Sequence, residues 1–376
     1  MRILVDYRPA LRERTGVGEY IHHLVSAHAA AYPSDELGLF TSSWRDRPAP
    51  DLAAGFGPGA VQVVDRKVPV RVLNYAWHRL AWPPVEWLAG SWDVAHSPHP
   101  LLMPARTAAR VVTIHDLFFM DRRDAVRGEV QRDYADLVAR HAQDADAVVT
   151  STEYGRALVA DRLGVPAARI HVCPPGAPRW QTLGVRPNRP AGGYLLFVGT
   201  LEPRKNLSVL LDAFARLLDH HADVPPLVVA GRATPEAAPL LARMAAPPLA
   251  GHVEYRGYVP DGDREALFAG AALLAIPSLD EGFGLPALEA MAAGVPVVAS
   301  TRGALPEVLH GSGLLVEALD VVGLCDAMAT LLFDEPRALA CAEAGLARAR
   351  TFTWERTARA VHGAYTDACS RRSAAR

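Results

Sequence analysis

Short apolar runs alternate with segments of helical periodicity along the whole chain. In the first half, strands are predicted at residues 3–7, 37–41, 61–64, 94–96, 111–115, 147–151 and 170–173. Helices are predicted between them at 18–31, 127–143 and 152–163. This alternation is typical of βαβ units, in which successive strands pair in parallel and helices cover the sheet. The first half is therefore predicted to be a parallel α/β domain.

The second half repeats this pattern. Strands are predicted at residues 194–199, 227–230, 253–256, 273–277, 295–300 and 313–316, and helices at 207–218, 263–269, 286–293, 321–332 and 337–349. The segment 185–193 is rich in Pro and Gly and has no periodicity, which predicts a linker. The chain thus divides into residues 1–185 and 193–352, and ligands are expected in a crevice between the halves, beyond the carboxyl ends of the strands.

Composition narrows the class of protein. The 376 residues are 50% hydrophobic and 21% charged, which is enough to bury two cores. A formal net charge of −2 argues against nucleic acid as the main partner. The four cysteines have no metal-ligand spacing, and no apolar run is long enough to span a membrane. We expect a soluble cytoplasmic protein that starts on a strand without a signal peptide, with peripheral contact at the inner membrane face left open.

The most informative loop follows the strand predicted at 273–277. Residues 281–289 read EGFGLPALE, in which Pro286 suits the first turn of a helix and Gly294 suits its left-handed end. Backbone N–H groups at Phe283, Gly284 and Leu285 would then point out of a helix N-terminus, which is a ready site for a diphosphate. The two carboxylates, Glu281 and Glu289, are placed to contact a sugar and a ribose.

These residues resemble a known family. A Glu, seven residues and a second Glu around Gly-Phe-Gly-Leu-Pro resemble the signature of the family 4 (group 1) retaining glycosyltransferases, and 290–300 and 303–307 resemble its flanks. The resemblance implies the GT-B fold, two Rossmann-like domains with parallel sheets facing a central cleft. It also implies that a last helix, about 353–376, joins the first domain, and that Glu281, Phe283 and Gly284 bind the donor sugar.

A second loop, 198–206, reads VGTLEPRKN after the first strand of the second half. Arg204 and Lys205 can neutralise phosphate there, and Asn206 is a candidate N-cap for the next helix. Lys205 is one of only two lysines among 39 basic residues. In the family that the chain resembles, the matching Arg and Lys bind the donor diphosphate, so the resemblance implies that role here.

Two loops in the first half are further candidates. Residues 15–19 read TGVGE without the third glycine of a dinucleotide fingerprint, and the family brings the matching glycines, Gly16 and Gly18, near the donor phosphate. His115 ends the strand 111–115, and the resemblance implies that it touches the transferred sugar. His96 and His99 can line the acceptor side or serve as ordinary structural histidines.

The last candidate loop follows the strand predicted at 253–256. The resemblance implies that the backbone of Gly257 and Val259, with Tyr258 nearby, binds the nucleobase. It further implies retention of anomeric configuration without a metal or cofactor, and we read no Asp-x-Asp metal motif in a strand-end loop. Glu281 and His115 are the predicted catalytic residues.

The partners are predicted less sharply than the reaction. A nucleotide-sugar donor is expected, GDP-mannose first and UDP-sugars next, with a glycan, a lipid-linked saccharide or a small molecule as acceptor. A sugar-nucleotide epimerase or hydrolase of the same fold and a non-catalytic sugar-nucleotide-binding protein are the alternatives. Residues 66–87 contain Trp77, Trp82 and Trp87 with four basic residues. They are interpreted as core or cleft tryptophans, with a membrane or lipid-linked acceptor as the alternative.

Overall fold

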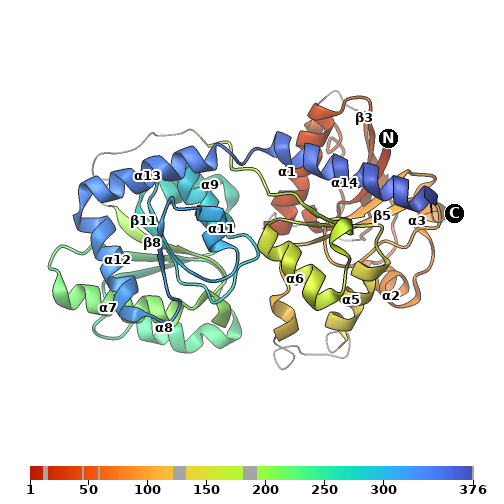
Figure 1. Cartoon of the computed structure of the whole chain (residues 1–376). Helices are drawn as coiled ribbons and strands as arrows, with labels where there is room; N and C mark the ends of the chain where they lie inside the picture. Colours follow the sequence, from red (N-terminus) through yellow and green to blue (C-terminus); the bar gives the residue numbers. More distant parts are fainter. Residues whose placement is uncertain (12–15, 45, 58–59, 122–132, 181–192, 375–376) are drawn as a thin grey trace. The chain divides into compact units, whose positions relative to one another are not determined.

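The computed structural model describes residues 1–376 except 12–15, 45, 58–59, 122–132, 181–192 and 375–376 (Figure 1). The chain forms two compact units. The first comprises Met1–Gly176 together with Thr353–Arg376, and the second comprises Ala177–Phe352. The segment predicted as a linker, 185–193, lies almost wholly outside the described residues.

The first unit is built on a seven-stranded parallel sheet. Its strands are β1 (Arg2–Asp6), β2 (Glu36–Thr41), β3 (Ala60–Asp65), β4 (Val94–Ser97), β5 (Ala109–Ile114), β6 (Ala147–Thr150) and β7 (Ile170–Val172). They lie in the order β3-β2-β1-β4-β5-β6-β7, and every pairing is parallel. The strand order therefore reverses between β1 and β4, which is where open α/β sheets bind ligands.

Helices cover both faces of this sheet. They are α1 (Gly16–Ala31), α2 (Val70–Leu80), α3 (Val85–Ala89), α5 (Tyr134–Asp144), α6 (Glu153–Leu163) and α14 (Trp354–Ala374). The side chains of β1 alternate between the two faces, as a strand's period of two requires. Ile3 and Val5 pack into the core under α1 and α14, whereas Leu4 packs with Trp77 of α2.

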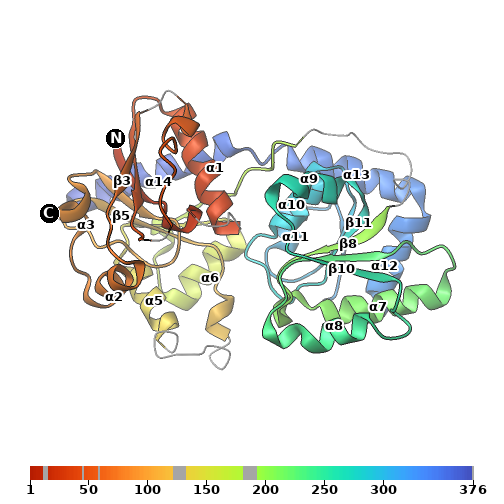
Figure 2. The same cartoon turned by 180° about the vertical axis from the view of Figure 1, so that it is seen from behind.

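The last helix belongs to the first unit and packs beside α1 (Figures 1 and 2). Trp354, Ala358, Val361, Tyr365 and Ala368 of α14 are buried in the core that also holds β1, β5 and β6. Their alternating spacing of four and three residues puts them on one face of the helix. One apolar stripe thus attaches the end of the chain to its first strands.

The second unit has a six-stranded parallel sheet in the order β10-β9-β8-β11-β12-β13. Its strands are β8 (Tyr194–Val198), β9 (Leu227–Ala230), β10 (Val253–Gly257), β11 (Ala271–Ile276), β12 (Val297–Ser300) and β13 (Leu314–Val316). Its helices are α7 (Leu207–His220), α8 (Ala238–Met244), α9 (Asp261–Ala269), α10 (Leu285–Ala292), α11 (Leu305–Leu309), α12 (Val321–Phe333) and α13 (Glu335–Ala349). The order of these strands reverses between β8 and β11.

The predicted strands are all present, with ends shifted by one or two residues. The helix predicted at 127–143 is observed as α5 from Tyr134, and residues 122–132 lie outside the described part of the chain. Four short or proline-flanked helices, α2, α3, α8 and α11, were not predicted. Within the described residues, no helix is both long and apolar enough to cross a bilayer.

Candidate active site

The loops after β8 and β11 meet at the switch point of the second sheet. These two strands are neighbours, with Leu196 opposite Leu274. The loop after β8 carries Arg204 and Lys205, and the loop after β11 carries Ser278 and Glu281. Because parallel neighbours end at the same edge, residues distant in the sequence come together there.

Lys205 and Glu281 form a buried ion pair at this edge. The Lys205 Nζ donates to Glu281 Oε1 at 2.6 Å, and the Ser278 hydroxyl donates to the same oxygen at 2.8 Å. Arg204 Nη1 lies 3.6 Å from Glu281 Oε2. Glu281 and Lys205 are only 5% and 8% exposed, and charges are buried so deeply only when they are paired.

Asn206 ties three loops together at the same place. Its backbone is left-handed, with φ +54°, which Asn tolerates better than most residues. Its side-chain amide donates to the carbonyls of Pro277, at 3.0 Å, and Ala318, at 2.7 Å. Asn206 occupies the predicted N-cap position of α7, but its side chain makes no cap hydrogen bond. It instead fixes the loop after β8 to the ends of β11 and β13.

The start of α10 has the predicted character. Gly284 is left-handed, with φ +89°, and the helix begins at Leu285 with Pro286 in its first turn. Among the described residues, none accepts a hydrogen bond from the N–H of Phe283, Gly284 or Leu285. These donors and the helix dipole make the α10 N-terminus a site suited to an anion.

The backbone of Glu281 is fixed from the other side by Gly303. The Glu281 carbonyl accepts a hydrogen bond from the Ala304 N–H at 2.9 Å. Gly303 has φ +64°, and a Cβ there would lie 2.5 Å from the Glu281 nitrogen. Only glycine permits this approach.

Glu289, predicted to contact the ribose, is paired with Arg264 of α9, which sequence reasoning missed. Arg264 donates two hydrogen bonds to the Glu289 carboxylate, at 2.9 Å from Nε and a shorter one from Nη2. Burial lowers the pKa of Arg264, but the Glu289 charge outweighs burial and the net pKa is raised. Tyr258 contributes to the same shift. The structure thus assigns the Glu289 carboxylate a guanidinium partner on α9.

The loop 257–259 is shaped by close backbone contacts. Gly257 has φ +65° and its carbonyl accepts from the Gly231 N–H at 2.6 Å, so that carbonyl is already engaged. The Arg232 guanidinium lies over the Tyr258 ring at 4.6 Å. Val259 follows in the same loop, and its predicted role in binding the base stays a prediction.

The two candidate glycines of the first unit, Gly16 and Gly18, lie in the first turn of α1 and not in a loop before it. Gly16 begins α1, with φ +29°, and Gly18 is a buried residue in its first turn. The helix was predicted to start only at residue 18, so this boundary was wrong. Glycine is tolerated in a first turn, where helical hydrogen bonds are incomplete. Thr15 lies outside the described residues.

His115 follows β5 and is held in one tautomer. Its Nε2 lies 3.3 Å from the Pro98 carbonyl, and a carbonyl only accepts, so Nε2 carries the proton. Burial lowers the pKa of His115, which keeps the imidazole neutral at pH 7. Nδ1 is then a hydrogen-bond acceptor, which suits contact with a sugar hydroxyl. The edge of the ring packs on Tyr20 at 4.9 Å.

His96 is structural. It is fully buried, and its two nitrogens bond Tyr365 at 2.8 Å and Thr113 at 2.9 Å. Burial lowers its pKa to about 3. It therefore cannot line an acceptor site, and the interpretation of His96 as an acceptor-side residue is wrong.

His99 joins a buried cluster at the end of β1. Its Nε2 lies 2.9 Å from Asp6 Oδ2, while Arg8 binds both oxygens of Asp6 at 2.8 and 2.6 Å. Burial would raise the pKa of Asp6, but Arg8 and then His99 outweigh it and hold the pKa well below its usual range. Sequence reasoning missed this cluster.

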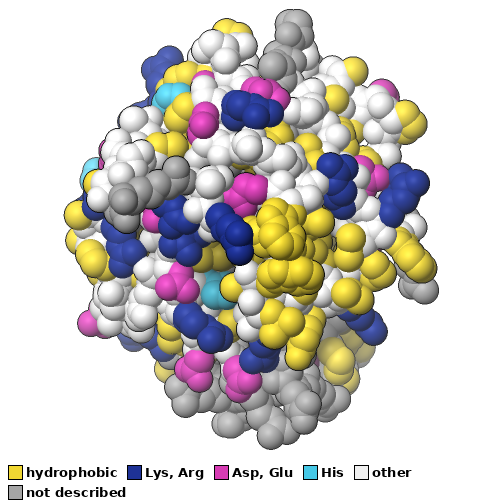
Figure 3. Space-filling model, turned by 90° about the vertical axis from the view of Figure 1, so that its right-hand side faces the viewer, with side chains coloured by type: hydrophobic (Ala, Val, Ile, Leu, Met, Phe, Trp, Pro, Cys, Tyr) yellow, Lys and Arg dark blue, Asp and Glu magenta, His cyan; other side chains and the backbone are white. Residues whose placement is uncertain are grey.

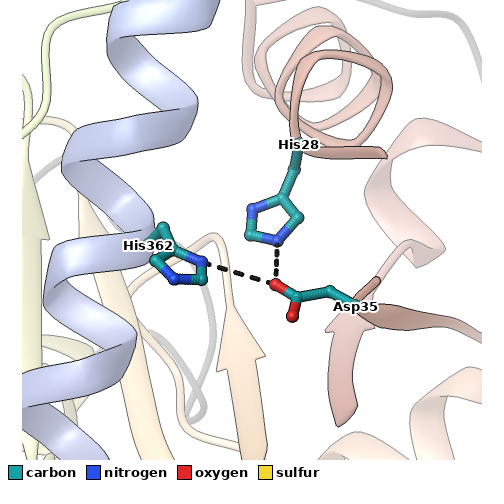
Figure 4. Close-up of side chains that lie close together, drawn as sticks. All are labelled: His28, Asp35 and His362. Atoms are coloured by element: carbon teal, nitrogen blue, oxygen red, sulfur yellow. Dashed lines mark hydrogen bonds and ion pairs between the residues drawn. The ribbon is translucent and has the colours of Figure 1, made fainter. Parts of the chain in front are cut away.

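Two Asp-x-Asp sequences occur outside the loops that follow strands. Asp144 and Asp146 lie at and just after the end of α5, and Asp261 and Asp263 lie in the first turn of α9. The cluster in the described residues whose ligand atoms lie near one another is His28, Asp35 and His362 of the first unit (Figure 4).

That cluster has the properties of a hydrogen-bond network. Asp35 Oδ2 lies 3.0 Å from His28 Nε2 and 3.4 Å from His362 Nδ1, and its other oxygen accepts from the N-terminal amine at 2.5 Å. Nδ1 of His28 has no hydrogen-bond partner among the described residues, whereas a metal-bound His normally donates from its second nitrogen.

Known proteins similar to this chain include several glycosyltransferases. Residues 15–176 match the family model "Glycosyl transferase 4-like domain", and residues 192–334 match "Glycosyl transferases group 1". The O-antigen chain mannosyltransferase B of Escherichia coli is 29% identical over 97% of this chain and 99% of its own. The D-inositol 3-phosphate glycosyltransferase of Corynebacterium glutamicum is 32% identical over 66% of this chain, which spans 58% of that relative.

Solved structures share the fold. Sucrose-phosphate synthase from Thermosynechococcus elongatus has a TM-score of 0.73 at 20% identity, over 97% of this chain and 98% of its own. WaaG, a glycosyltransferase involved in lipopolysaccharide biosynthesis, has a TM-score of 0.69 at 18% identity over the same shares. Two family models that together match most of the chain, and a relative aligned over nearly all of it, show that this protein belongs to the group 1 glycosyltransferases and has the GT-B fold.

Proposed function

We propose that the chain transfers a hexose from a nucleotide-diphosphate sugar to an acceptor hydroxyl with retention of anomeric configuration. The observation that supports this proposal most strongly is the Lys205–Glu281 pair beside the α10 N-terminus. Cations and unbonded N–H groups lie together there, at the switch point of the sheet. A departing diphosphate develops negative charge, and fixed donors stabilise that charge during the reaction. Arg204, Lys205 and the N–H groups of 283–285 are the proposed donors.

The contacts of Glu281 support a positioning role for this residue over a nucleophilic one. Its Oε1 already accepts two hydrogen bonds, and Oε2 faces Arg204. Such contacts stabilise the carboxylate and reduce its tendency to attack carbon. In our proposal Glu281 orients Lys205 and the donor sugar, and His115 accepts a hydrogen bond from a hydroxyl of that sugar.

The proposed step balances without an enzyme nucleophile. The bond from the anomeric carbon to the phosphate oxygen breaks, and the acceptor oxygen bonds that carbon on the same face. The acceptor proton passes to the departing phosphate oxygen, which Arg204 and Lys205 hold. No metal enters this proposal.

GDP-mannose is the proposed donor, so mannose is the sugar transferred. A glycan is the proposed acceptor. The mannosyltransferase that matches over almost the whole chain supports this choice. UDP-sugars are the second candidate, since the fold is shared with a protein solved with UDP and glucose, Anabaena HepE, at a TM-score of 0.67 and 17% identity. The product separates the possibilities: NMR of the purified product should show the anomeric configuration of the donor. An inverted product would exclude retention, and release of free or epimerised sugar would favour a hydrolase or an epimerase.

A further inference from the structure

The site leaves unexplained a group of exposed apolar side chains in the first unit. The tryptophans of 66–87 were interpreted as core or cleft residues, and among them only Trp77 is buried in the core. Trp82 and Trp87 are more than half exposed and stand edge to face, with ring centroids 6.0 Å apart. With Val72, Tyr75 and Leu80 they form what we call the α2–α3 surface.

Helix α2 shows why this surface is unusual. Leu73 and Trp77 face inward and fill the core under the helix. The opposite side of a surface helix is normally polar. In α2 that side carries Val72 and Tyr75, and the five members of the α2–α3 surface are 54–62% exposed. Apolar side chains gathered on one face mark an interaction surface more often than chance exposure.

Cations outnumber acids along this stretch, although Arg79 is paired with Asp133 at 3.0 Å. Residues 66–87 contain four cations, Arg66, Lys67, Arg71 and Arg79, against the single acid Glu86, although the whole chain has 39 basic and 41 acidic residues. The Glu86 carboxylate is itself engaged, accepting from the N–H groups of Thr107 and Arg106. Hydrophobic side chains and Lys and Arg side chains lie together on this side of the molecule in Figure 3.

We propose that the α2–α3 surface docks on a membrane that carries anionic phospholipid. Trp and Tyr favour the boundary between headgroups and acyl chains, and Lys and Arg bind the headgroup phosphates. A symmetric contact with a second copy fits less well, because a two-fold interface would bring the same cations together from both sides. The proposal goes beyond the proposed function, since none of these residues belongs to the donor site.

Vesicle flotation tests the proposal with the full chain. Wild type should float with vesicles of phosphatidylglycerol and phosphatidylcholine, float less with phosphatidylcholine alone, and detach in high salt. Lys67→Glu combined with Arg71→Glu should weaken partitioning by at least about tenfold, since each basic residue near an anionic surface contributes to binding. Trp82→Ala combined with Trp87→Ala should lose most binding at any lipid charge.

Matched controls keep the test sharp. Phe333→Ala, an exposed aromatic of α12, and Arg337→Glu with Arg350→Glu, exposed cations of the second unit, should float like wild type. All variants should keep the wild-type melting temperature and turnover of a water-soluble acceptor, so failure of docking is distinguishable from failure of the transfer proposal. Wild type that ignores anionic vesicles, surface variants that float unchanged, or a dimer that the tryptophan variant dissolves would each overturn the proposal.

Discussion

The Glu281 carboxylate accepts hydrogen bonds from Lys205 and Ser278 and faces Arg204. All four residues lie in loops at the carboxyl edge of the second sheet. This arrangement serves two purposes in the proposed account. It holds Lys205, whose Nζ has three donors, where it can also bind a phosphate. It also fixes a carboxylate beside the sugar without leaving it free to react. The site is therefore organised before a donor arrives.

Replacing Glu281 by Gln should reduce kcat/KM by about 10²–10³, because the fixed negative charge that orients Lys205 toward the diphosphate is lost. The buried Lys205 then lacks its carboxylate, so the free energy of unfolding should also fall, by about 3 kcal/mol. Steady-state kinetics well below the melting temperature separates the two effects. Glu317→Gln, an exposed carboxylate of the second unit, is the control. Turnover equal to wild type in Glu281→Gln would remove it from the catalytic residues.

Glu289 has a structural partner that complicates its test. Glu289→Ala should weaken binding of a nucleoside diphosphate through the lost ribose contact, and it should also destabilise the unit because the partly buried Arg264 loses its anion. Combining it with Arg264→Met should recover part of the stability but not the affinity. Calorimetric titration of both variants measures the affinity, and thermal melts measure the stability. Wild-type affinity in the double variant would show that Glu289 acts only through Arg264.

Sequence reasoning identified the residues of the site better than their contacts. Glu281, Lys205 and Arg204 follow from their positions at strand ends and from the resemblance. The pairing of Lys205 with Glu281 spans 76 positions of sequence, and no local pattern indicates it. Arg264, Asp6 and Arg8 were missed for the same reason, since each acquires its role from a partner on another element. Asn206 was correctly placed before α7, but its sequence position does not reveal that its side chain bonds the carbonyls of Pro277 and Ala318.

At the scale of elements, strand ends place the chemistry and buried polar contacts hold the elements together. His96 of β4 is one such contact, since it joins Thr113 of β5 to Tyr365 of α14. The strands were predictable because parallel strands read as short apolar runs between turn residues. Helices α2 and α3 were not, because Trp82, Pro83 and Pro84 between them break the expected periodicity.

The first unit should lose stability in acid through His96. Its pKa is about 3 in the folded unit against 6.5 ordinarily, so between these values the unfolded chain binds a proton that the folded unit does not. Its contribution is complete above pH 6.5 and is lost as the pH falls toward 3, at about 1.4 kcal/mol per pH unit. Denaturant unfolding between pH 7 and pH 4.5 should give a shallower pH slope for His96→Gln. His252→Gln, which replaces an exposed histidine, should keep the wild-type slope. An unchanged slope in His96→Gln would contradict this assignment.

At the scale of the whole molecule, the predicted site residues are distributed over the two units. Most of the predicted diphosphate contacts and all of the predicted nucleoside contacts lie within Ala177–Phe352, whereas Gly16, Gly18 and His115 belong to the first unit together with α14. The connection at the end of the chain is the part that local patterns could not predict. It followed only from the resemblance, because nothing in the sequence of α14 shows which sheet it will cover.

Ending the chain after Phe352 should destabilise the first unit and leave the stability of the second unit unchanged. Without α14, the core under Trp354 and Tyr365 opens, and the first unit should lose its cooperative unfolding. The second unit should still melt cooperatively and bind a nucleoside diphosphate. Calorimetry with and without nucleotide reads both, and Arg359→Ala, on the exposed side of α14, is the control. A truncated chain whose first unit melts as in wild type would contradict the role of α14.

Titration of GDP and of UDP into wild type and into Lys205→Met tests the central claim most directly. The account predicts that one of the two, GDP first, binds wild type and stabilises it against heat. Lys205→Met should bind that nucleotide at least about tenfold more weakly, because a charge-assisted hydrogen bond to the diphosphate is lost. Binding of neither nucleotide, or equal affinity in the two proteins, would contradict a donor site at the Lys205–Glu281 pair.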